Sequence, residues 1–156
     1  MELLLPILLV IAVFFIFRTL QKNKQHAALN KAAGKEFLEK NRNKEGIIET
    51  SSGLQYEILA KEEEGATPSA TSKVKVHYHG TLIDGRVFDS SVERGEAIEF
   101  GLNQVITGWT EGLQLMSKGD KFRFFIPAEL AYGDGSVAII PAGSTLIFEV
   151  ELIDFK

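Results

Sequence analysis

The chain has 156 residues, 45% of them hydrophobic and none of them cysteine, which fits one packed domain with an appendage and excludes disulfides, thiolate catalysis and thiolate metal sites. Its net charge of -4 is spread unevenly: residues 1–50 carry eight Lys and Arg against five Asp and Glu, whereas residues 51–156 carry nine against sixteen. An acidic domain lacks the clustered positive charge that phosphate contacts need, which argues against a nucleic-acid partner.

Residues 1–20 are predicted to form a hydrophobic membrane anchor. No side chain from residue 3 to residue 17 is polar, and Arg18 and two lysines follow shortly afterwards. As a helix, residues 1–20 would reach roughly 30 Å, about the thickness of the bilayer core. The segment starts with an acidic rather than a basic residue and shows no small-residue cleavage site. An uncleaved anchor is therefore favoured over a cleaved signal peptide and over a buried core helix.

Residues 21–46 are predicted to form a helical stalk or linker. Small and apolar residues recur at near-helical spacing from Gln21 to Asn43, among Lys and Glu side chains, and Gly46 is a stop signal. Two interpretations stay open: a solvated stalk, and a helix that packs on a partner chain. The weak apolar stripe consists of Ala27, Ala28, Ala32, Ala33, Phe37 and Leu38.

Residues 47–156 consist of the short alternating segments that are typical of β-strands. Residues 73–80 alternate strictly between apolar and polar side chains, and Asp84-Gly85 predicts a hairpin. Apolar residues at helical spacing predict one short helix over 108–116. These elements predict an α+β fold in which a curved antiparallel sheet wraps over the short central helix, because that arrangement buries the apolar faces of both. Further strands are predicted over residues 53–60, 97–100, 121–127 and 145–155.

The sequence contains none of the motifs that mark common catalytic classes: a Gly-rich phosphate loop, a nucleophile elbow or HExxH. His77 and His79 share one face of a predicted strand, so an H-x-H metal pair is one interpretation of them. No cysteine or third histidine stands near them in the sequence. We therefore expect neither a metal ion nor a cofactor.

Several aromatic residues stand beside predicted loops. Core packing is the first interpretation, because aromatic side chains supply much of the buried area of a small domain. It explains Phe122 and Phe124, but not Tyr132, which lies in a turn-rich Ala-Tyr-Gly-Asp-Gly stretch, nor Asp89, a carboxylate directly after an aromatic residue. The alternative is a pocket. The aromatic residues that could build it are Tyr78, Phe88, Phe100, Trp109, Tyr132 and Phe148.

Six ordered motifs between about residue 53 and residue 155 resemble the FKBP family of peptidyl-prolyl cis-trans isomerases. Residues 37–56 are similar to the bacterial Mip/FkpA-like subgroup, in which a helical N-terminal region mediates dimerisation. That region is much shorter here, so dimerisation stays open. The motifs are VHYHG at 76–80, DGRVFDSS at 84–91, QVITGW at 104–109, IPAELAYG at 126–133, IIP at 139–141 and TLIFEVEL at 145–152.

The resemblance implies a half-wrapped antiparallel sheet around a short helix and catalysis of X–Pro bond rotation in proline-containing polypeptides. It assigns Trp109 to the pocket floor, the Tyr132 hydroxyl and the Ile139 N–H to substrate carbonyls, and Asp89 to the rim with Arg94 as its partner. The implied catalytic residues are Tyr78, Asp89, Trp109 and Tyr132. The implied substrate-binding residues are Phe88, Phe100, Val105, Ile106, Ile139 and Phe148.

Two departures from the family pattern bear on ligands. Glu96 stands where eukaryotic members have a pocket aromatic, for which Phe100 is the expected substitute, and the loop after Tyr132 is about one residue shorter. Macrolides of the rapamycin type are implied as inhibitors.

The alternative function is a proline-peptide-binding chaperone or assembly module with little turnover. The charges after the anchor favour the cytoplasmic side of the membrane, whereas the subgroup resemblance favours the periplasm.

Overall fold

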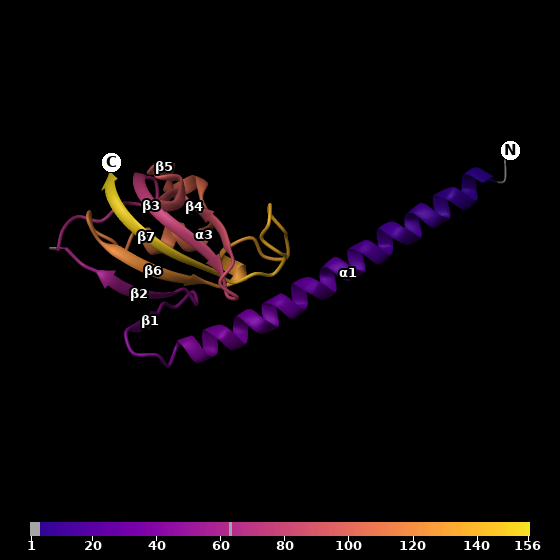
Figure 1. The fold of residues 1–156 in the computed structure, drawn as a ribbon, viewed down its shortest axis with the longest axis horizontal. Helices are drawn as coiled ribbons and strands as arrows, with labels where there is room; N and C mark the ends of the chain where they lie inside the picture. Colours follow the sequence, from indigo (N-terminus) through magenta and orange to yellow (C-terminus); the bar gives the residue numbers. More distant parts are fainter. Residues whose placement is uncertain (1–3, 63) are drawn as a thin grey trace.

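The computed structural model, which describes residues 4–62 and 64–156, contains one long helix followed by a sheet-rich domain (Figure 1). The long helix, α1, runs from Leu4 to Asn41. Two short α-helices follow within the domain, α2 (Ser91–Arg94) and α3 (Thr107–Leu113), and 3-10 helices lie at Leu102–Gln104 and Ala128–Leu130. The strands are β1 (Ile47–Glu49), β2 (Gln55–Ala60), β3 (Lys73–Leu82), β4 (Val87–Ser90), β5 (Ile98–Gly101), β6 (Lys121–Ile126) and β7 (Leu146–Phe155).

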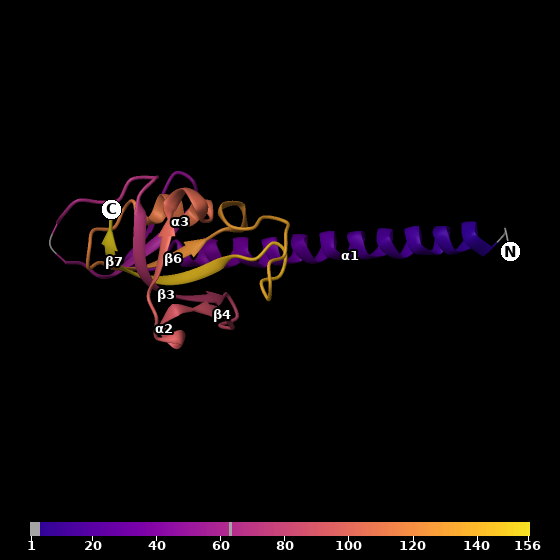
Figure 2. The ribbon, with the colours of Figure 1, turned by 90° about the horizontal axis from the view of Figure 1, so that it is seen from above.

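The seven strands form one antiparallel sheet in the order β1-β2-β6-β7-β3-β4, and β5 pairs with β3 beside β4. The two ten-residue strands, β3 and β7, pair along most of their length at the centre of the sheet. The sheet curves around α3 (Figures 1 and 2). The predicted α+β arrangement of an antiparallel sheet and a short helix is confirmed. The sequence patterns did not reveal β1 or α2, and they gave no bounds for β4, the second strand of the predicted hairpin; all three are only three or four residues long.

Strict alternation along β3 turns one set of side chains into the core. Val74, Val76 and Tyr78 are buried, and Trp109 and Leu113 of α3 lie in the same hydrophobic cluster. Because successive side chains of a strand point to opposite faces, the sequence pattern correctly identified this inner face.

Helix α1 is continuous where the sequence predicted an anchor to residue 20 and a stalk to residue 46. Its N-terminal half projects away from the domain, and its C-terminal half lies along it (Figures 1 and 2). Along residues 27–41 the helix packs against the chain's own domain. This differs from both interpretations that the sequence left open, a solvated stalk and a helix that packs on a partner chain. The side chain of Asn41 donates a hydrogen bond of 2.9 Å to buried Gln55 of β2.

The inward face of α1 differs from the stripe predicted from the sequence. Of the four predicted alanines only Ala27 is buried, and the others face solvent. Gly34, Leu38 and Asn41 complete the buried face at spacings of three to seven residues, which places them on one side of a helix. A glycine and an asparagine carry no hydrophobic signal, so the apolar pattern could not show the true direction of this face.

In the part of the chain that the structure describes, no helix is both long enough and apolar enough to cross a membrane. The membrane-spanning anchor predicted over residues 1–20 is therefore not confirmed, and its first three residues lie outside the described part. The apolar run gives way to Arg18, Lys22 and Lys24 within eighteen residues of Ile7.

Candidate active site

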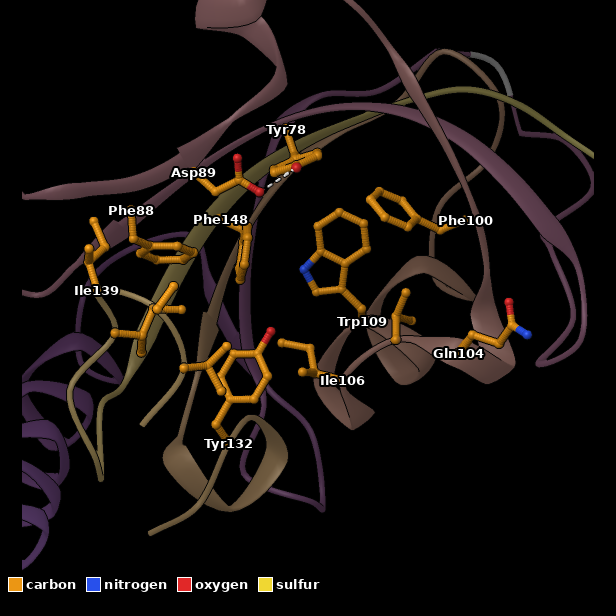
Figure 3. A pocket seen from close by; sticks show the side chains of 14 residues that line it. Tyr78, Phe88, Asp89, Phe100, Gln104, Ile106, Trp109, Tyr132, Ile139 and Phe148 are labelled. Carbon is orange, nitrogen blue, oxygen red and sulfur yellow. Dashed lines mark hydrogen bonds between the residues drawn. The ribbon is translucent and has the colours of Figure 1, made fainter. Parts of the chain in front are cut away.

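A pocket of about 570 Å³ opens between the curved sheet, the start of α3 and the loop that precedes β7 (Figure 3). The structure brings every sequence-predicted site residue to the wall of this one pocket. These residues are Tyr78, Phe88, Asp89, Phe100, Val105, Ile106, Trp109, Tyr132, Ile139 and Phe148. Glu96 is exposed and is not among the lining residues, whereas Phe100 is.

Trp109 forms the floor of the pocket and is only 4% exposed. Three aromatic rings meet its indole edge-on, with centroids 5.4 Å away for Tyr78, 5.6 Å for Phe100 and 5.2 Å for Phe148. Edge-to-face pairs at this spacing are favourable beyond their buried area. Phe88 packs edge-on against Phe148 in turn, at 5.3 Å. The apolar lining is therefore held in one arrangement before any ligand enters.

The indole nitrogen of Trp109 is buried and has no hydrogen-bond partner among the described residues. Figure 3 shows it turned toward the space between Phe148, Ile106 and Tyr132. A buried N–H without an acceptor carries an unfavourable desolvation energy, typically about 1–3 kcal/mol. A ligand that brings an acceptor into the pocket can satisfy it.

A polar cluster at the rim joins Tyr78, Asp89 and Arg94. The Tyr78 hydroxyl donates to an Asp89 carboxylate oxygen at 2.5 Å, and Arg94 donates to the Tyr78 hydroxyl at 3.0 Å. Arg94 also forms an ion pair with Asp89. The helix α2 places Arg94 here, because the side chain of Ser90, the last residue of β4, caps that helix by accepting from the Glu93 amide.

This cluster keeps the Asp89 carboxylate ionised. Burial of Asp89 opposes ionisation, but hydrogen bonds from Tyr78 and Arg94 and the charge of Arg94 outweigh it, so the pKa of Asp89 lies below its ordinary value. Burial, together with the hydrogen bond to Asp89, raises the pKa of Tyr78. The rim of the pocket thus carries a carboxylate and a neutral phenol at physiological pH.

The opposite wall comes from the segment between β6 and β7. Tyr132 is 41% exposed, and its hydroxyl points into the pocket (Figure 3). Val137 and Ile140 exchange backbone hydrogen bonds of 3.1 and 2.8 Å and form a tight turn, in which Ala138 takes a left-handed φ of 49°. The amide of Ile139, at the tip of this turn, takes no part in either bond.

Four further residues line the pocket: Gln104, Val137, Ala138 and Ile140. Gln104 lies in the motif QVITGW and Ile140 in the motif IIP, so these two motifs could have identified both residues as part of the site. Val137 and Ala138 lie between motifs, in a stretch without periodicity. Only the closed turn reveals that their side chains reach the site.

His77 and His79 lie on the opposite face of β3 and are half-buried. The Nδ1 atom of His77 is 3.0 Å from the Ser91 hydroxyl, and that of His79 is 2.9 Å from the Ser90 hydroxyl. Among the described residues, no group of three or more His, Cys, Asp or Glu side chains is placed to hold a metal ion. Both imidazoles instead tie β3 to the β4–α2 corner that carries the rim cluster.

Residues 64–153 match the family model of the FKBP-type peptidyl-prolyl cis-trans isomerase, and residues 11–58 match that of the domain amino terminal to it. An FKBP-type peptidyl-prolyl cis-trans isomerase FkpA of Aeromonas hydrophila is 54% identical over 135 residues, which cover 86% of this chain and 50% of that protein. The FKBP-type 22 kDa peptidyl-prolyl cis-trans isomerase of Escherichia coli is 55% identical over 124 residues, which cover 79% of this chain and 60% of that protein.

The crystal structure of FkpA from Escherichia coli superposes with a TM-score of 0.90 at 44% identity, covering 96% of this chain and 70% of that one. The likeness therefore includes α1 as well as the sheet-rich domain. The chain spans about half the length of the Aeromonas relative and three fifths of the 22 kDa relative.

Proposed function

The chain belongs to the FKBP-type peptidyl-prolyl cis-trans isomerase family, and on that basis we propose that its pocket accelerates cis–trans rotation of X–Pro bonds in polypeptides. The observation that carries the proposal is the rigid aromatic pocket with one unpaired N–H at its floor. It has the size and apolar character that a prolyl ring requires, together with a few polar groups to orient the chain.

The physical problem is the barrier of roughly 18–20 kcal/mol to rotation about the peptide bond, which arises from amide resonance. At the top of this barrier the twisted amide has lost conjugation and carries less charge separation than the planar amide. Water solvates the planar dipole better, so a pocket that excludes water favours the twisted form. No bond is made or broken in the polypeptide, and no nucleophile or cofactor is required.

Only contacts that are stronger in the twisted state than in the planar state accelerate the rotation. Trp109, Val105 and Phe148 would grip the prolyl ring, while the Tyr132 hydroxyl and the Ile139 amide would hold neighbouring carbonyls. Asp89 would act on the carbonyl carbon electrostatically as it twists. About 4 kcal/mol of such differential stabilisation corresponds to roughly a 10³-fold acceleration.

The Tyr132→Phe variant tests whether the Tyr132 hydroxyl, on the pocket wall opposite the rim cluster, contributes to the reaction. Because the substitution removes a single neutral hydrogen bond, we expect kcat/KM for a proline-containing tetrapeptide to fall roughly fivefold, equivalent to about 1 kcal/mol. The full chain is assayed by following the isomerisation of the peptide directly.

The matched control is Tyr56→Phe, since Tyr56 stacks on Phe122 and lies outside the pocket. Equal rates for wild type, Tyr132→Phe and the control would show that the Tyr132 hydroxyl does not contribute to the reaction.

A wild-type chain that binds the peptide without accelerating its isomerisation would favour the alternative function, a proline-binding chaperone. A rapamycin-type macrolide is proposed as a competitor for the same pocket and would displace the peptide.

We also propose that residues 1–20 associate the chain with a membrane. What supports this is the apolar stretch from Ile7 to Phe17, whose large side chains are between 45% and 67% exposed on all sides of α1. Burying such side chains in a lipid interface is favourable in proportion to their apolar area. The proposal concerns association and leaves the side of the membrane open between the cytoplasm and the periplasm.

Vesicle flotation measures this association. We expect the full chain to float with phospholipid vesicles and the Phe15→Asp variant to float markedly less, because a charged side chain in the lipid interface is unfavourable. Leu29→Asp is the matched control: Leu29 is as exposed as Phe15 on the same helix but lies beyond the apolar stretch. Flotation that is absent in the wild type, or equally weakened in both variants, contradicts the proposal.

A further inference from the structure

We propose that α1 is a positioning element for the pocket: its residues 27–34 seat the segment that carries Tyr132 and Ile139. We call residues 131–145 the pocket loop. The inference rests on the proposed function for its effect on catalysis. The seating itself can be measured separately.

Four neighbouring points join α1 to the pocket loop. The side chain of Asn30 donates to the Ala142 carbonyl at 2.8 Å, and Lys31 forms an ion pair of 2.7 Å with Asp134. The other two points are close approaches at glycines: Gly143 of the loop meets the backbone of Ala27, and Gly34 of the helix meets the side chain of Thr145. The contacts reach both limbs of the loop, because Asp134 belongs to its first limb and Ala142 to its second.

Gly143 lies directly against the helix backbone. A Cβ atom at this position would collide with the Ala27 carbonyl oxygen and lie 3.0 Å from its carbonyl carbon. The backbone of a packed helix cannot swing aside as a side chain can. Ala27 itself is 3% exposed, although the side chains of residues 7–26 of the same helix are exposed. The contact is therefore closed and leaves no room for a larger residue.

Gly34 is a second close contact, in which the glycine belongs to α1 and its partner belongs to the pocket loop. A Cβ atom there would overlap the Thr145 hydroxyl and lie 3.1 Å from the Thr145 Cβ. Thr145 is buried and is the last residue before β7. Glycine in the middle of a helix is unfavourable by roughly 1 kcal/mol relative to alanine. The close contact with Thr145 is a physical reason for its presence here.

The seated loop carries one wall of the pocket on its other side. The Gly143 amide donates to the Gly133 carbonyl at 2.9 Å, and this bond links the helix contact to the residue next to Tyr132. Beyond this bond the loop bears Val137, Ala138, Ile139 and Ile140, all of which line the pocket. Displacing the base of the loop from α1 must therefore shift the groups proposed to hold substrate carbonyls. The rim cluster and Trp109 stand on other elements and would stay in place.

Because the loop can shift while the rim cluster and Trp109 stay in place, we expect loosening of the loop to change KM more than kcat. In the full-chain Gly143→Ala variant, we expect the KM for a proline-containing tetrapeptide to rise about threefold or more with kcat changed less, because substrate positioning is lost while Trp109 and Asp89 remain. Amide hydrogen exchange should accelerate in the pocket loop and in residues 27–34 together, since each holds the other.

Gly85→Ala is the matched control. Gly143 and Gly85 have φ values of 76° and 90°, so alanine is strained at both, but nothing lies within 4 Å of a Cβ at Gly85. Gly34→Ala is a second test: alanine favours the helix, yet its Cβ presses on Thr145, so we expect the same rise in KM without loss of helix. Like Gly143→Ala, it should accelerate exchange in the pocket loop.

The inference is overturned if Gly143→Ala and Gly34→Ala match the Gly85→Ala control in KM and in pocket-loop exchange. It is supported if only the two contact variants loosen the loop. A wild-type chain without isomerase activity would refute the proposed function alone, because hydrogen exchange still decides whether α1 seats the loop.

Discussion

Replacing Trp109 with alanine is expected to lower kcat/KM for a proline-containing tetrapeptide by roughly 100-fold, equivalent to about 2.7 kcal/mol of transition-state stabilisation. The substitution removes the pocket floor, together with the surface on which Tyr78, Phe100 and Phe148 pack edge-on. Water then enters the space where the twisted amide is proposed to bind, and the advantage of an apolar environment disappears. The assay follows peptide isomerisation by the full chain.

A large-to-small change in a core also lowers stability, by roughly 3–5 kcal/mol for Trp or Phe to Ala. Phe122→Ala is therefore the matched control, since Phe122 is as deeply buried but packs against Tyr56 and Phe124, away from the pocket. Both variants are compared at a temperature where circular dichroism shows each to be folded. An equal loss of activity in both would mean that Trp109 acts only through stability.

Asp89→Asn is expected to lower kcat/KM by roughly tenfold, because it removes the charge proposed to act on the twisting carbonyl and weakens the hold of Arg94 and Tyr78. The amide keeps nearly the same shape, so the fold and the pocket should persist. Asp84→Asn is the control: Asp84 also forms an ion pair with an arginine, Arg86, but lies on the exposed β3–β4 turn. Similar losses in the two variants would contradict a role for the Asp89 charge.

The pH dependence of the wild type follows from the same cluster. The pKa of Asp89 is below its ordinary value and that of Tyr78 is above it, so neither group changes charge between about pH 5 and about pH 9. Activity should therefore be flat across this range. The stabilising contribution of Asp89 is present above the unfolded-state pKa of aspartate and is lost as pH falls through its lower folded-state pKa. An activity titration near neutral pH in the wild type that Asp89→Asn abolishes would contradict this assignment.

Much of the candidate site could be anticipated from the sequence because its residues lie in short ordered motifs. Trp109 lies in the first turn of a short helix, and Asp89 lies on the second strand of the hairpin whose turn Asp84-Gly85 marks. Turn chemistry and strand alternation act over a few neighbouring residues and indicate only the turns and strands, whereas the assignment of these residues to one site came from the resemblance of the ordered motifs to the FKBP family. The structure brings these residues to one pocket, while their individual roles in catalysis stay predictions.

The sequence by itself determined the α+β class, the inner face of the central strand and the helical character of residues 21–41, because each depends on local periodicity. Only the tertiary structure decided where α1 lies. Its buried face includes Gly34 and Asn41, which no hydrophobic pattern identifies. The partners of Asn30 and Lys31 stand about a hundred residues further along the chain. Which face of a helix is buried depends on the shape of the opposing surface. Over residues 27–34 that surface is the pocket loop, whose form is set by the hydrogen bonds of its own closed turn.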